Sequence, residues 1–354
     1  MNISGWERNV RRVEPYVPGE QPKQAGVIKL NTNENPYPPA PGVRAAVEAV
    51  QADTYRLYPD PEAALLTEAL ADTYGVRPEQ VFVGVGSDDV LAMCFLTFFN
   101  GDAPVLFPDI TYSFYDVWAR LFGIPYVCVP LDTDFHMCAK DYKRPNGGIL
   151  FPNPNAPTGI EEPQSLLREI LDANPDSVVI VDEAYVDFGA ESALPLIDTY
   201  ENLLVVQTMS KSRSMAGVRI GYAFGSAKLI GYLRDVKFSF NSYTMSRTAL
   251  AAGAAALSDR AYFNETRQRI IKTREWTKGQ LRELGFAFPD SKSNFIFASH
   301  ETRSARELFM ALKEQRIYVR YFDKPRIDNH IRITIGTDAQ MQSLIDFLRA
   351  YLRK

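Results

Sequence analysis

A lysine surrounded by hydroxyl-bearing residues is the most informative chemical feature of this sequence. Lys211 lies in the segment Thr208-Met-Ser-Lys-Ser-Arg-Ser-Met-Ala-Gly-Val-Arg219, directly after a predicted strand. Most lysines are solvated surface groups, but this segment lies between apolar strands and is too small and polar to be core. Ser210 supplies a hydroxyl and Arg219 a second cation. Two cations with neutral donors at a sheet edge suit a bound phosphate, which accepts both kinds of hydrogen bond.

A carboxylate follows another predicted strand. Val179-Ile-Val-Asp182 places three β-branched residues directly before an acid, so Asp182 should lie at the C-terminal end of a buried parallel strand. Ligands bind at that edge of open α/β sheets. A carboxylate there is costly unless it has a cationic partner or several donors. Asp182 is therefore either a structural turn cap or the partner of a cation such as a protonated pyridine nitrogen.

Two loops at the same predicted edge offer further contacts. Gly84-Val-Gly-Ser87-Asp88 is a strand–turn–helix junction whose free backbone N–H groups form a ready anion site. The alternative is a simple helix cap by Ser87 or Asp88. Asn153-Pro-Asn-Ala-Pro-Thr-Gly159 has so many turn-forming residues that it must be an irregular loop, either a connector or a binding loop.

Short apolar strands alternate with helices between about residues 62 and 226, and these elements must position the chemistry. The pattern predicts helices at 61–74, 87–99, 111–122 and 164–171, and strands at 81–85, 105–107, 126–129, 149–151, 178–181, 203–207 and 218–224. Such alternation favours an α/β fold with a largely parallel sheet covered on both faces. Later residues predict helices up to about 284, then strands at 295–297, 317–319 and 331–335 with helices after Ser304 and from Thr337 or Asp338.

The same patterns predict three parts along the chain. Residues 1–40 are proline-rich and read as an arm that returns to pack on the C-terminal part. Residues 41–250 form a large α/β domain, and residues 251–354 form a smaller α+β domain.

Composition excludes several classes of function. The 354 residues include 39 Lys+Arg and 43 Asp+Glu, a net charge of −4 that gives no general attraction to nucleic acid or anionic lipid. No run approaches the roughly 18 apolar residues of a membrane span, and the N-terminus has no apolar signal core. The three histidines and three cysteines are too scattered for a metal site. We expect a cytoplasmic protein without metal, nucleic-acid or membrane partners.

Together and in this order, the motifs resemble the fold-type I, pyridoxal 5'-phosphate-dependent aminotransferases, and within them the histidinol-phosphate aminotransferases. The resemblance covers nearly the whole chain through Glu14-Pro-Tyr-Val-Pro-Gly19, Leu30-Asn-Thr-Asn-Glu-Asn-Pro-Tyr37, Tyr58-Pro-Asp-Pro61, Gly86-Ser-Asp88, the loop 153–159, Asp182-Glu-Ala-Tyr185, Ser210-Lys211 with Arg219, and Ile331-Arg-Ile-Thr-Ile-Gly336. It implies a mostly parallel large domain, a smaller α+β domain and a homodimer. The implied ping-pong reaction, in histidine biosynthesis, interconverts histidinol phosphate and 2-oxoglutarate with imidazole-acetol phosphate and glutamate.

The resemblance also implies roles for residues around the cofactor. Lys211 would bind the cofactor aldehyde covalently and then move the proton between substrate Cα and cofactor C4′. Asp182 would keep the pyridine nitrogen protonated, and Tyr185 would reach the phenolic oxygen of the ring. The remaining implied contacts are to the cofactor phosphate or the ring face: Ser87, Asp88, Ser210, Arg219 and, across a dimer interface, Tyr58 at the phosphate, with Tyr112 on the ring.

One position departs from the family pattern. The family commonly has Asn-Asn-Pro-Thr-Gly, but Ala156 stands at the second asparagine. Either Asn155 reaches the ring oxygen instead or Tyr185 makes that contact alone. Arg213, two residues after the lysine, has no implied role and is expected to be solvated.

Substrate binding, by the same resemblance, rests on arginines in the C-terminal part. Arg332 would hold the α-carboxylate of glutamate as a planar bidentate partner. The same pocket must also accept the bulkier phosphate dianion, for which Arg320 and Tyr16 offer further donors. Asn33, in the motif before Tyr37, is the fourth expected substrate contact.

Three other functions stay open. An aromatic-amino-acid aminotransferase and a threonine-phosphate decarboxylase use the same cofactor and are similar at these motifs. A nucleotide-binding oxidoreductase is a remote alternative, because Gly84 and Gly86 lack the third glycine of a dinucleotide fingerprint. That function would also leave Lys211 and Asp182 unexplained.

Overall fold

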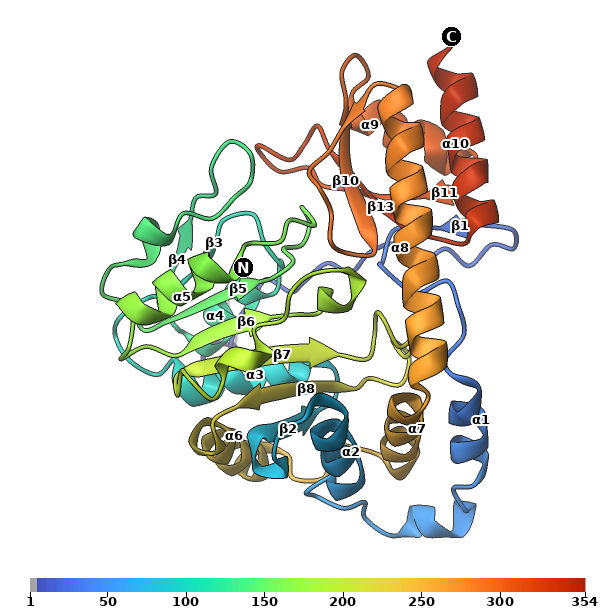
Figure 1. Ribbon diagram of the computed structural model, residues 1–354. Coiled ribbons are helices and arrows are strands. Elements are labelled where there is room, and N and C mark those ends of the chain that lie inside the picture. The colour runs from blue at the N-terminus through green and yellow to red at the C-terminus, as the bar shows by residue number, and fades with distance from the viewer. Residues whose placement is uncertain (1–4, 354) are drawn as a thin grey trace.

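A seven-stranded sheet forms the centre of the computed structural model, which describes residues 5–353 (Figure 1). Residues 1–4 of the expected arm and Lys354 lie outside the described residues. The strands are β2 (Val81–Gly84), β3 (Val105–Pro108), β4 (Tyr126–Val129), β5 (Gly148–Pro152), β6 (Val179–Asp182), β7 (Leu203–Thr208) and β8 (Gly221–Gly225), in the order β2-β8-β7-β6-β5-β3-β4. The neighbours from β7 to β4 pair in parallel, and β8 runs antiparallel to both β2 and β7. The predicted α/β fold with a largely parallel sheet is confirmed.

Helices cover both faces of this sheet, because alternate strand residues point to opposite sides. Phe107, Ile180 and Leu204 face α3 (Ser87–Phe98), α4 (Tyr115–Phe122) and α6 (Ala227–Phe240) in one apolar cluster. Phe151 and Val181 face a second cluster with α1 (Pro41–Glu48), α2 (Ala64–Tyr74), α5 (Gln164–Ala173) and α7 (Arg247–Ser258). The strands between the two layers are buried throughout, apart from the edge strand β4.

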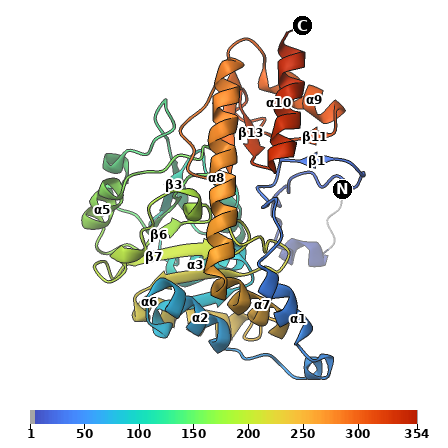
Figure 2. The same ribbon diagram turned by 45° about the vertical axis from the view of Figure 1, so that its right-hand side comes forward.

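A second, antiparallel sheet lies in the C-terminal part, in the order β12-β13-β10-β9. Its strands are β9 (Phe286–Ala287), β10 (Phe295–His300), β12 (Arg320–Tyr321) and β13 (Ile331–Thr334), packed with α9 (Ala305–Glu314) and α10 (Asp338–Leu352). Ser304 and Thr337 cap these two helices, each in a reciprocal capping box. Strand β1 (Ile28–Lys29) pairs in parallel with β11 (Ile317–Tyr318), so the N-terminal segment returns to the C-terminal part (Figure 2).

The longest helix, α8 (Arg260–Glu283), runs from α7 past the central sheet to the C-terminal sheet (Figures 1 and 2). It contacts α10, β9, β10 and the 3-10 helix η5 (Val186–Phe188). The other 3-10 helices are η1 (Gly5–Asn9), η2 (Ala52–Arg56), η3 (Pro78–Gln80), η4 (Ala139–Tyr142) and η6 (Leu194–Leu196). Within residues 5–353, no helix has the length and apolar character to cross a membrane.

Several predicted boundaries differ from the structure by a few residues, and two of them have clear local reasons. The helix expected from residue 111 begins at Tyr115, after a turn over residues 112–114. The strand expected from residue 218 begins at Gly221, because Arg219 has a φ of +61°, in the left-handed region that a strand does not accommodate. This left-handed residue lies in the connection between β7 and the reversed strand β8.

Candidate active site

Two adjoining cavities lie where the parallel strands end, facing the C-terminal sheet. The inner cavity, of about 160 Å³, is lined by Thr32, Glu34, Ser87, Asp88, Tyr112, Pro152, Ala156, Asp182, Ala184, Tyr185, Ser210, Lys211, Ala216 and Arg219. The outer cavity, of about 190 Å³, shares Thr32, Tyr112, Ala156, Tyr185 and Lys211 with it and adds, among others, Tyr16, Asn33, Arg320, Phe322, Lys324 and Arg332. Residues that are far apart in the sequence, from the arm to β13, therefore line one continuous site.

Asp182 ends β6 inside the inner cavity, with only 4% of its surface exposed. Its Oδ2 accepts a hydrogen bond of 2.9 Å from the Tyr115 hydroxyl, and its Oδ1 accepts one of 3.2 Å from the Ala184 N–H. Burial raises the pKa of Asp182 to about 6, although the Tyr115 hydrogen bond and the Lys211 charge oppose that shift. A buried carboxylate with two donors and a raised pKa can still accept a cationic partner, which would favour its charged form.

The opposite end of the inner cavity is built for an anion. Ser87 and Asp88 begin α3, where backbone N–H groups lack partners within the helix. Gly86 precedes them with a φ of +85°, and a side chain there would collide with the Arg219 guanidinium. The Arg219 Nη2 lies 3.2 Å from Asp88 Oδ2, and the Ser210 hydroxyl accepts a 3.0 Å hydrogen bond from Thr208 Oγ1. The start of α3, the Ser210 hydroxyl and the Arg219 guanidinium thus line the same cavity.

Lys211 lies between the two cavities. The Lys211 Nζ is 3.5 Å from the Thr32 carbonyl oxygen and 5.8 Å from the centroid of the Tyr185 ring. Among the described residues, no carboxylate forms an ion pair with it. The Lys211 amine therefore has no carboxylate partner among the described residues and is available to bind a ligand in either cavity.

The loop that carries Lys211 is anchored on both sides. Asn35 Nδ2 donates a 2.9 Å hydrogen bond to the Lys211 carbonyl, and the Ser212 hydroxyl donates to the Asp187 carboxylate. Arg213 is 7% exposed, so the expectation that it is solvated is wrong. Its guanidinium lies 4.1 Å from the centroid of the Phe263 ring and donates 2.9 Å to the Ala256 carbonyl. Stacking on an aromatic ring and a carbonyl partner compensate for its loss of water.

Two tyrosines flank Lys211 in the cavities. The Tyr185 hydroxyl accepts a 2.8 Å hydrogen bond from Asn33 Nδ2. The Tyr112 hydroxyl donates a 2.7 Å hydrogen bond to Asp88 Oδ1, and burial, followed by the Asp88 charge, raises the pKa of Tyr112. Tyr112 therefore stays a neutral donor at the anion end of the inner cavity.

Arg320 and Arg332 pair across strands β12 and β13 and both line the outer cavity. Arg332 donates 3.1 Å to the Asn31 carbonyl, while its Nε is buried with no hydrogen-bond partner among the residues that the structure describes. Its guanidinium lies 5.2 Å from the centroid of Phe295, and burial lowers its pKa. Within residues 5–353, neither arginine forms an ion pair with a carboxylate. Two such cations suit a carboxylate or phosphate ligand.

Of the expected site residues, Asn155 and Tyr58 line neither cavity. The Asn155 amide is turned away and donates to the Ile110 carbonyl at 3.0 Å and to Thr158 Oγ1 at 3.2 Å, and Ala156 lines the cavities in its place. Tyr58 is 77% exposed and stacks on Tyr243 with 4.5 Å between ring centroids.

Several residues of the site were not among the sequence predictions, and Tyr115 and Thr32 are the most informative of them. Tyr115 donates a hydrogen bond to Asp182, yet it is fully buried on a helix that packs on the sheet. In the sequence such a tyrosine cannot be told from an ordinary core residue. Thr32 lines both cavities, and within residues 5–353 its buried Oγ1 has no hydrogen-bond partner. The only signal for Thr32 was its place in the Leu30–Tyr37 motif.

Comparisons with known proteins agree with this geometry. The profile of the family "Aminotransferase class I and II" matches residues 25–348. The chain is 53% identical over 350 residues to the histidinol-phosphate aminotransferase of Acinetobacter baylyi, covering 98% of this chain and 97% of that protein. It is 54% identical over 348 residues to histidinol-phosphate aminotransferase 2 of Dechloromonas aromatica, covering 97% of this chain and 98% of that protein.

Solved structures have the same fold. The histidinol-phosphate aminotransferase of Sinorhizobium meliloti in complex with pyridoxal-5'-phosphate is 27% identical to this chain and superposes with a TM-score of 0.81. The superposition covers 92% of this chain and 91% of that chain. The enzyme of Clostridium acetobutylicum has a TM-score of 0.85 over 92% of this chain and 99% of that chain, at 20% identity. The profile match and the identity to full-length relatives show that this chain belongs to the class I and II aminotransferases, within the histidinol-phosphate aminotransferases.

Proposed function

We propose that this protein is a pyridoxal 5'-phosphate-dependent aminotransferase that interconverts histidinol phosphate and 2-oxoglutarate with imidazole-acetol phosphate and glutamate, a reaction of histidine biosynthesis in the cytoplasm. The observation that carries the proposal is the position of Lys211. This unpaired amine lines both cavities, with Asp182 and the start of α3 around one and Arg320 and Arg332 around the other. The named activity of the full-length relatives supports the same substrates.

The residues of the inner cavity fit the cofactor. Its phosphate would accept hydrogen bonds from the α3 N–H groups of Ser87 and Asp88, from the Ser210 hydroxyl and from Arg219. The missing side chain of Gly86 leaves room for the Arg219 guanidinium, which a Cβ would displace. The buried Asp182 carboxylate would pair with the ring nitrogen, Tyr112 would lie on the ring, and Tyr185 would donate to its phenolic oxygen. The Asn33 hydrogen bond leaves the Tyr185 proton free for that contact. Because the Asn155 amide is turned to Ile110, we infer that Tyr185 makes this contact alone.

The chain's own groups then divide the chemistry. When bound, pyridoxal phosphate supplies an electron-withdrawing ring that stabilises negative charge at the substrate Cα. Lys211 would hold the cofactor covalently until an amine substrate displaces the lysine from the cofactor. The free Lys211 Nζ would then take the proton from the substrate Cα. Asp182, as an anion, would keep the ring nitrogen protonated, and Tyr185 would fix the orientation of the ring. Each group acts from a side chain already fixed by packing or hydrogen bonds, which lowers the reorganisation that catalysis needs.

The outer cavity would hold the substrates by their anionic groups. Arg332 would bind the α-carboxylate of glutamate and the phosphate of histidinol phosphate in turn, because a guanidinium matches both groups with two parallel hydrogen bonds. Arg320 and the Tyr16 hydroxyl would bind the remaining oxygens of the larger dianion, and Asn33 would complete the pocket.

The proposal includes a homodimer in which Tyr58 of one subunit reaches the cofactor phosphate of the other. Support comes from Tyr55, Leu57, Tyr58 and Tyr243, which are large side chains left 45–77% exposed on the described chain. We also propose the division into an arm at 1–40, a cofactor-binding domain at 41–250 and a small domain at 251–354.

The test compares amine substrates on the purified, cofactor-loaded protein with 2-oxoglutarate as acceptor. We expect kcat/KM for histidinol phosphate to exceed that for phenylalanine by about 100-fold or more. The carboxylate of phenylalanine has fewer oxygens than the phosphate and would leave donors of Arg320 and Arg332 without a partner. Threonine phosphate should yield no carbon dioxide. Faster turnover of phenylalanine would favour the aromatic-amino-acid aminotransferase, and carbon dioxide release would favour the decarboxylase.

A further inference from the structure

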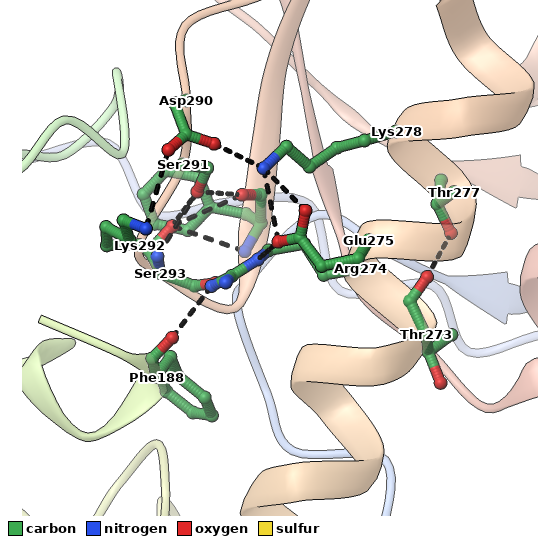
Figure 3. Close-up of polar contacts among 11 residues, drawn as sticks. Phe188, Thr273, Arg274, Glu275, Thr277, Lys278, Asp290, Ser291, Lys292 and Ser293 are labelled. Carbon is green, nitrogen blue, oxygen red and sulfur yellow. Dashed lines mark hydrogen bonds and ion pairs between the residues drawn. The ribbon is translucent and has the colours of Figure 1, made fainter.

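A buried arginine on α8 contacts the turn that follows the Asp182 strand (Figure 3). The Arg274 side chain is 3% exposed. Its Nη1 donates to two backbone carbonyls, that of Phe188 at 2.9 Å and that of Ser293 at 2.8 Å. Its Nε donates to Glu275 Oε1 at 2.9 Å. Arg274 therefore links α8 to two separate loops, one after β6 and one before β10.

Each of these carbonyls belongs to a segment that ends at the active site. Phe188 closes the short turn that starts at Tyr185, and its N–H donates 3.1 Å to the Tyr185 carbonyl. Ser293 lies two residues before Phe295, whose ring packs edge-on against Tyr185 with centroids 5.1 Å apart. The same Phe295 ring has the Arg332 guanidinium 5.2 Å from its centroid. A single guanidinium thus joins the Tyr185 turn to the strand that touches both Tyr185 and Arg332.

The loop before β10, residues 290–294, is held by several hydrogen bonds, so the contact with Arg274 can fix where this loop lies relative to α8. The hydroxyls of Ser291 and Ser293 both donate to the Phe295 carbonyl, at 2.6 and 3.2 Å. The Lys292 N–H donates 2.8 Å to the Gly159 carbonyl, which ties the loop to the 153–159 segment. Lys278, 2% exposed and one helical turn after Arg274, binds Asp290 at 2.5 Å and Glu275 at 2.9 Å (Figure 3).

A buried cation is costly unless its donors are satisfied, and the Arg274 guanidinium satisfies its donors with two carbonyls and a carboxylate. Lys278 lies in the same cluster, but its hydrogen bonds within the described part of the chain go to the carboxylates of Glu275 and Asp290. The two cations therefore have similar burial and different reach. Arg274 itself lines neither cavity.

We propose that Arg274 is a positioning residue for transamination, which holds Tyr185 and Arg332 in their mutual arrangement through the carbonyls of Phe188 and Ser293. The inference rests on the proposed function. The proposal gives α8 a part in the reaction, because α8 would set the distance between Tyr185, beside the cofactor ring, and Arg332, which would bind the substrate anion.

The test compares Arg274→Met and Arg274→Lys with the matched control Lys278→Met, all as cofactor-loaded protein. The first readout is amide hydrogen exchange over residues 185–190 without substrate. We expect faster exchange there in Arg274→Met and unchanged exchange in Lys278→Met. The second readout is the pH titration of the visible absorbance of the lysine-bound cofactor, which should move only in the Arg274 variants, and less in Arg274→Lys than in Arg274→Met.

Kinetics complete the test. We expect kcat/KM to fall about tenfold or more in Arg274→Met, because displacement of catalytic groups by about an ångström has effects of that size. Arg274→Lys should recover part of the loss, and Lys278→Met should lower the thermal midpoint with little change in kcat/KM. Equal changes of exchange, titration and kcat/KM in the two Met variants would overturn the proposal. Absence of wild-type turnover with histidinol phosphate would instead overturn the proposed function, since exchange over 185–190 does not depend on it.

Discussion

Asn33 and Tyr185 join the N-terminal arm to the turn after the central strand β6. The Asn33 Nδ2 donates a 2.8 Å hydrogen bond to the Tyr185 hydroxyl across a sequence separation of 152 residues. Asn33 is 2% exposed, and its backbone has a φ of +56°, which asparagine tolerates better than most residues. Thr334 fixes it further by bonding both its N–H and its Oδ1, each at 3.0 Å. The segment around Asn33 therefore contributes to the outer cavity.

Asn33→Gly keeps this backbone conformation and removes only the side chain. We expect the pKa of the lysine-bound cofactor, read from visible absorbance against pH, to rise by about 0.7 unit, the equivalent of one hydrogen bond of about 1 kcal/mol. Tyr185→Phe should shift it in the same direction, and the double variant should add little. Additive shifts would show that Asn33 does not act through Tyr185.

Asp182 predicts an unusual pH dependence of the cofactor-free protein. Its pKa is about 6 in the folded chain against an ordinary 3.8, so the folded state holds more protons between these values. Its contribution to the free energy of unfolding therefore falls as pH rises from about 4 to about 6 and stays lower above that.

Asp182→Asn removes the free-energy cost of holding a charged carboxylate in this buried position. Without cofactor, the variant should be more stable than the wild type at about pH 8, by about 1–3 kcal/mol in urea unfolding, and the difference should vanish near pH 4. With cofactor, the order should reverse and transamination should be lost, because the amide cannot balance a cationic ring nitrogen. A variant without cofactor that is less stable than the wild type at pH 8 would contradict the account.

The paired arginines predict separate effects on the two substrates. Arg332→Ala should raise KM for glutamate and for histidinol phosphate by about 10- to 100-fold, the range expected for a lost charged hydrogen bond. Arg320→Ala should raise KM more for histidinol phosphate than for glutamate, since the dianion has more oxygens to bind. Cofactor absorbance serves as the control and should not change. An unchanged KM for glutamate in Arg332→Ala would remove that residue from the substrate site.

Lys211→Ala should fold, because the Lys211 amine makes one long hydrogen bond to Thr32, lies 5.8 Å from the centroid of the Tyr185 ring and forms no ion pair within the described residues. We expect no transamination and no cofactor fixed to the protein by borohydride reduction, as judged by mass spectrometry. Lys228→Ala, which removes an exposed lysine paired with Glu201, is the control and should retain both properties. A reducible adduct in Lys211→Ala would place the covalent attachment elsewhere.

The sequence predicted well which residues lie at the carboxyl edge of the central sheet, because the residue types and the order of the strands along the chain determine that edge. Asp182 follows three β-branched residues at the end of β6, which pairs in parallel with β5 and β7, so its place at this edge followed from the pattern. Ser87 follows β2, which reaches the same edge because the reversed strand β8 lies between β2 and β7. The reversed direction of β8 did not follow, because a short apolar run has the same pattern in either direction.

Side-chain directions within the site were less predictable. Arg213 has the composition of a surface residue, and its burial depends on Phe263, a ring 50 residues later that only the tertiary fold brings near. Asn155 and Ala156 are neighbours in one loop, yet only the second lines the cavities, since the local backbone decides which side chain points inward. Tyr115 binds Asp182 from a helix whose other buried residues are core.

The most direct test of the central claim is a single half-reaction of the cofactor-loaded wild-type protein. Mixed with histidinol phosphate in the absence of 2-oxoglutarate, it should lose the visible absorbance of the lysine-bound cofactor and release about one equivalent of imidazole-acetol phosphate per subunit. Addition of 2-oxoglutarate should then restore the absorbance and yield glutamate. Unchanged absorbance with histidinol phosphate, or release of a product without recovery by 2-oxoglutarate, would contradict the account.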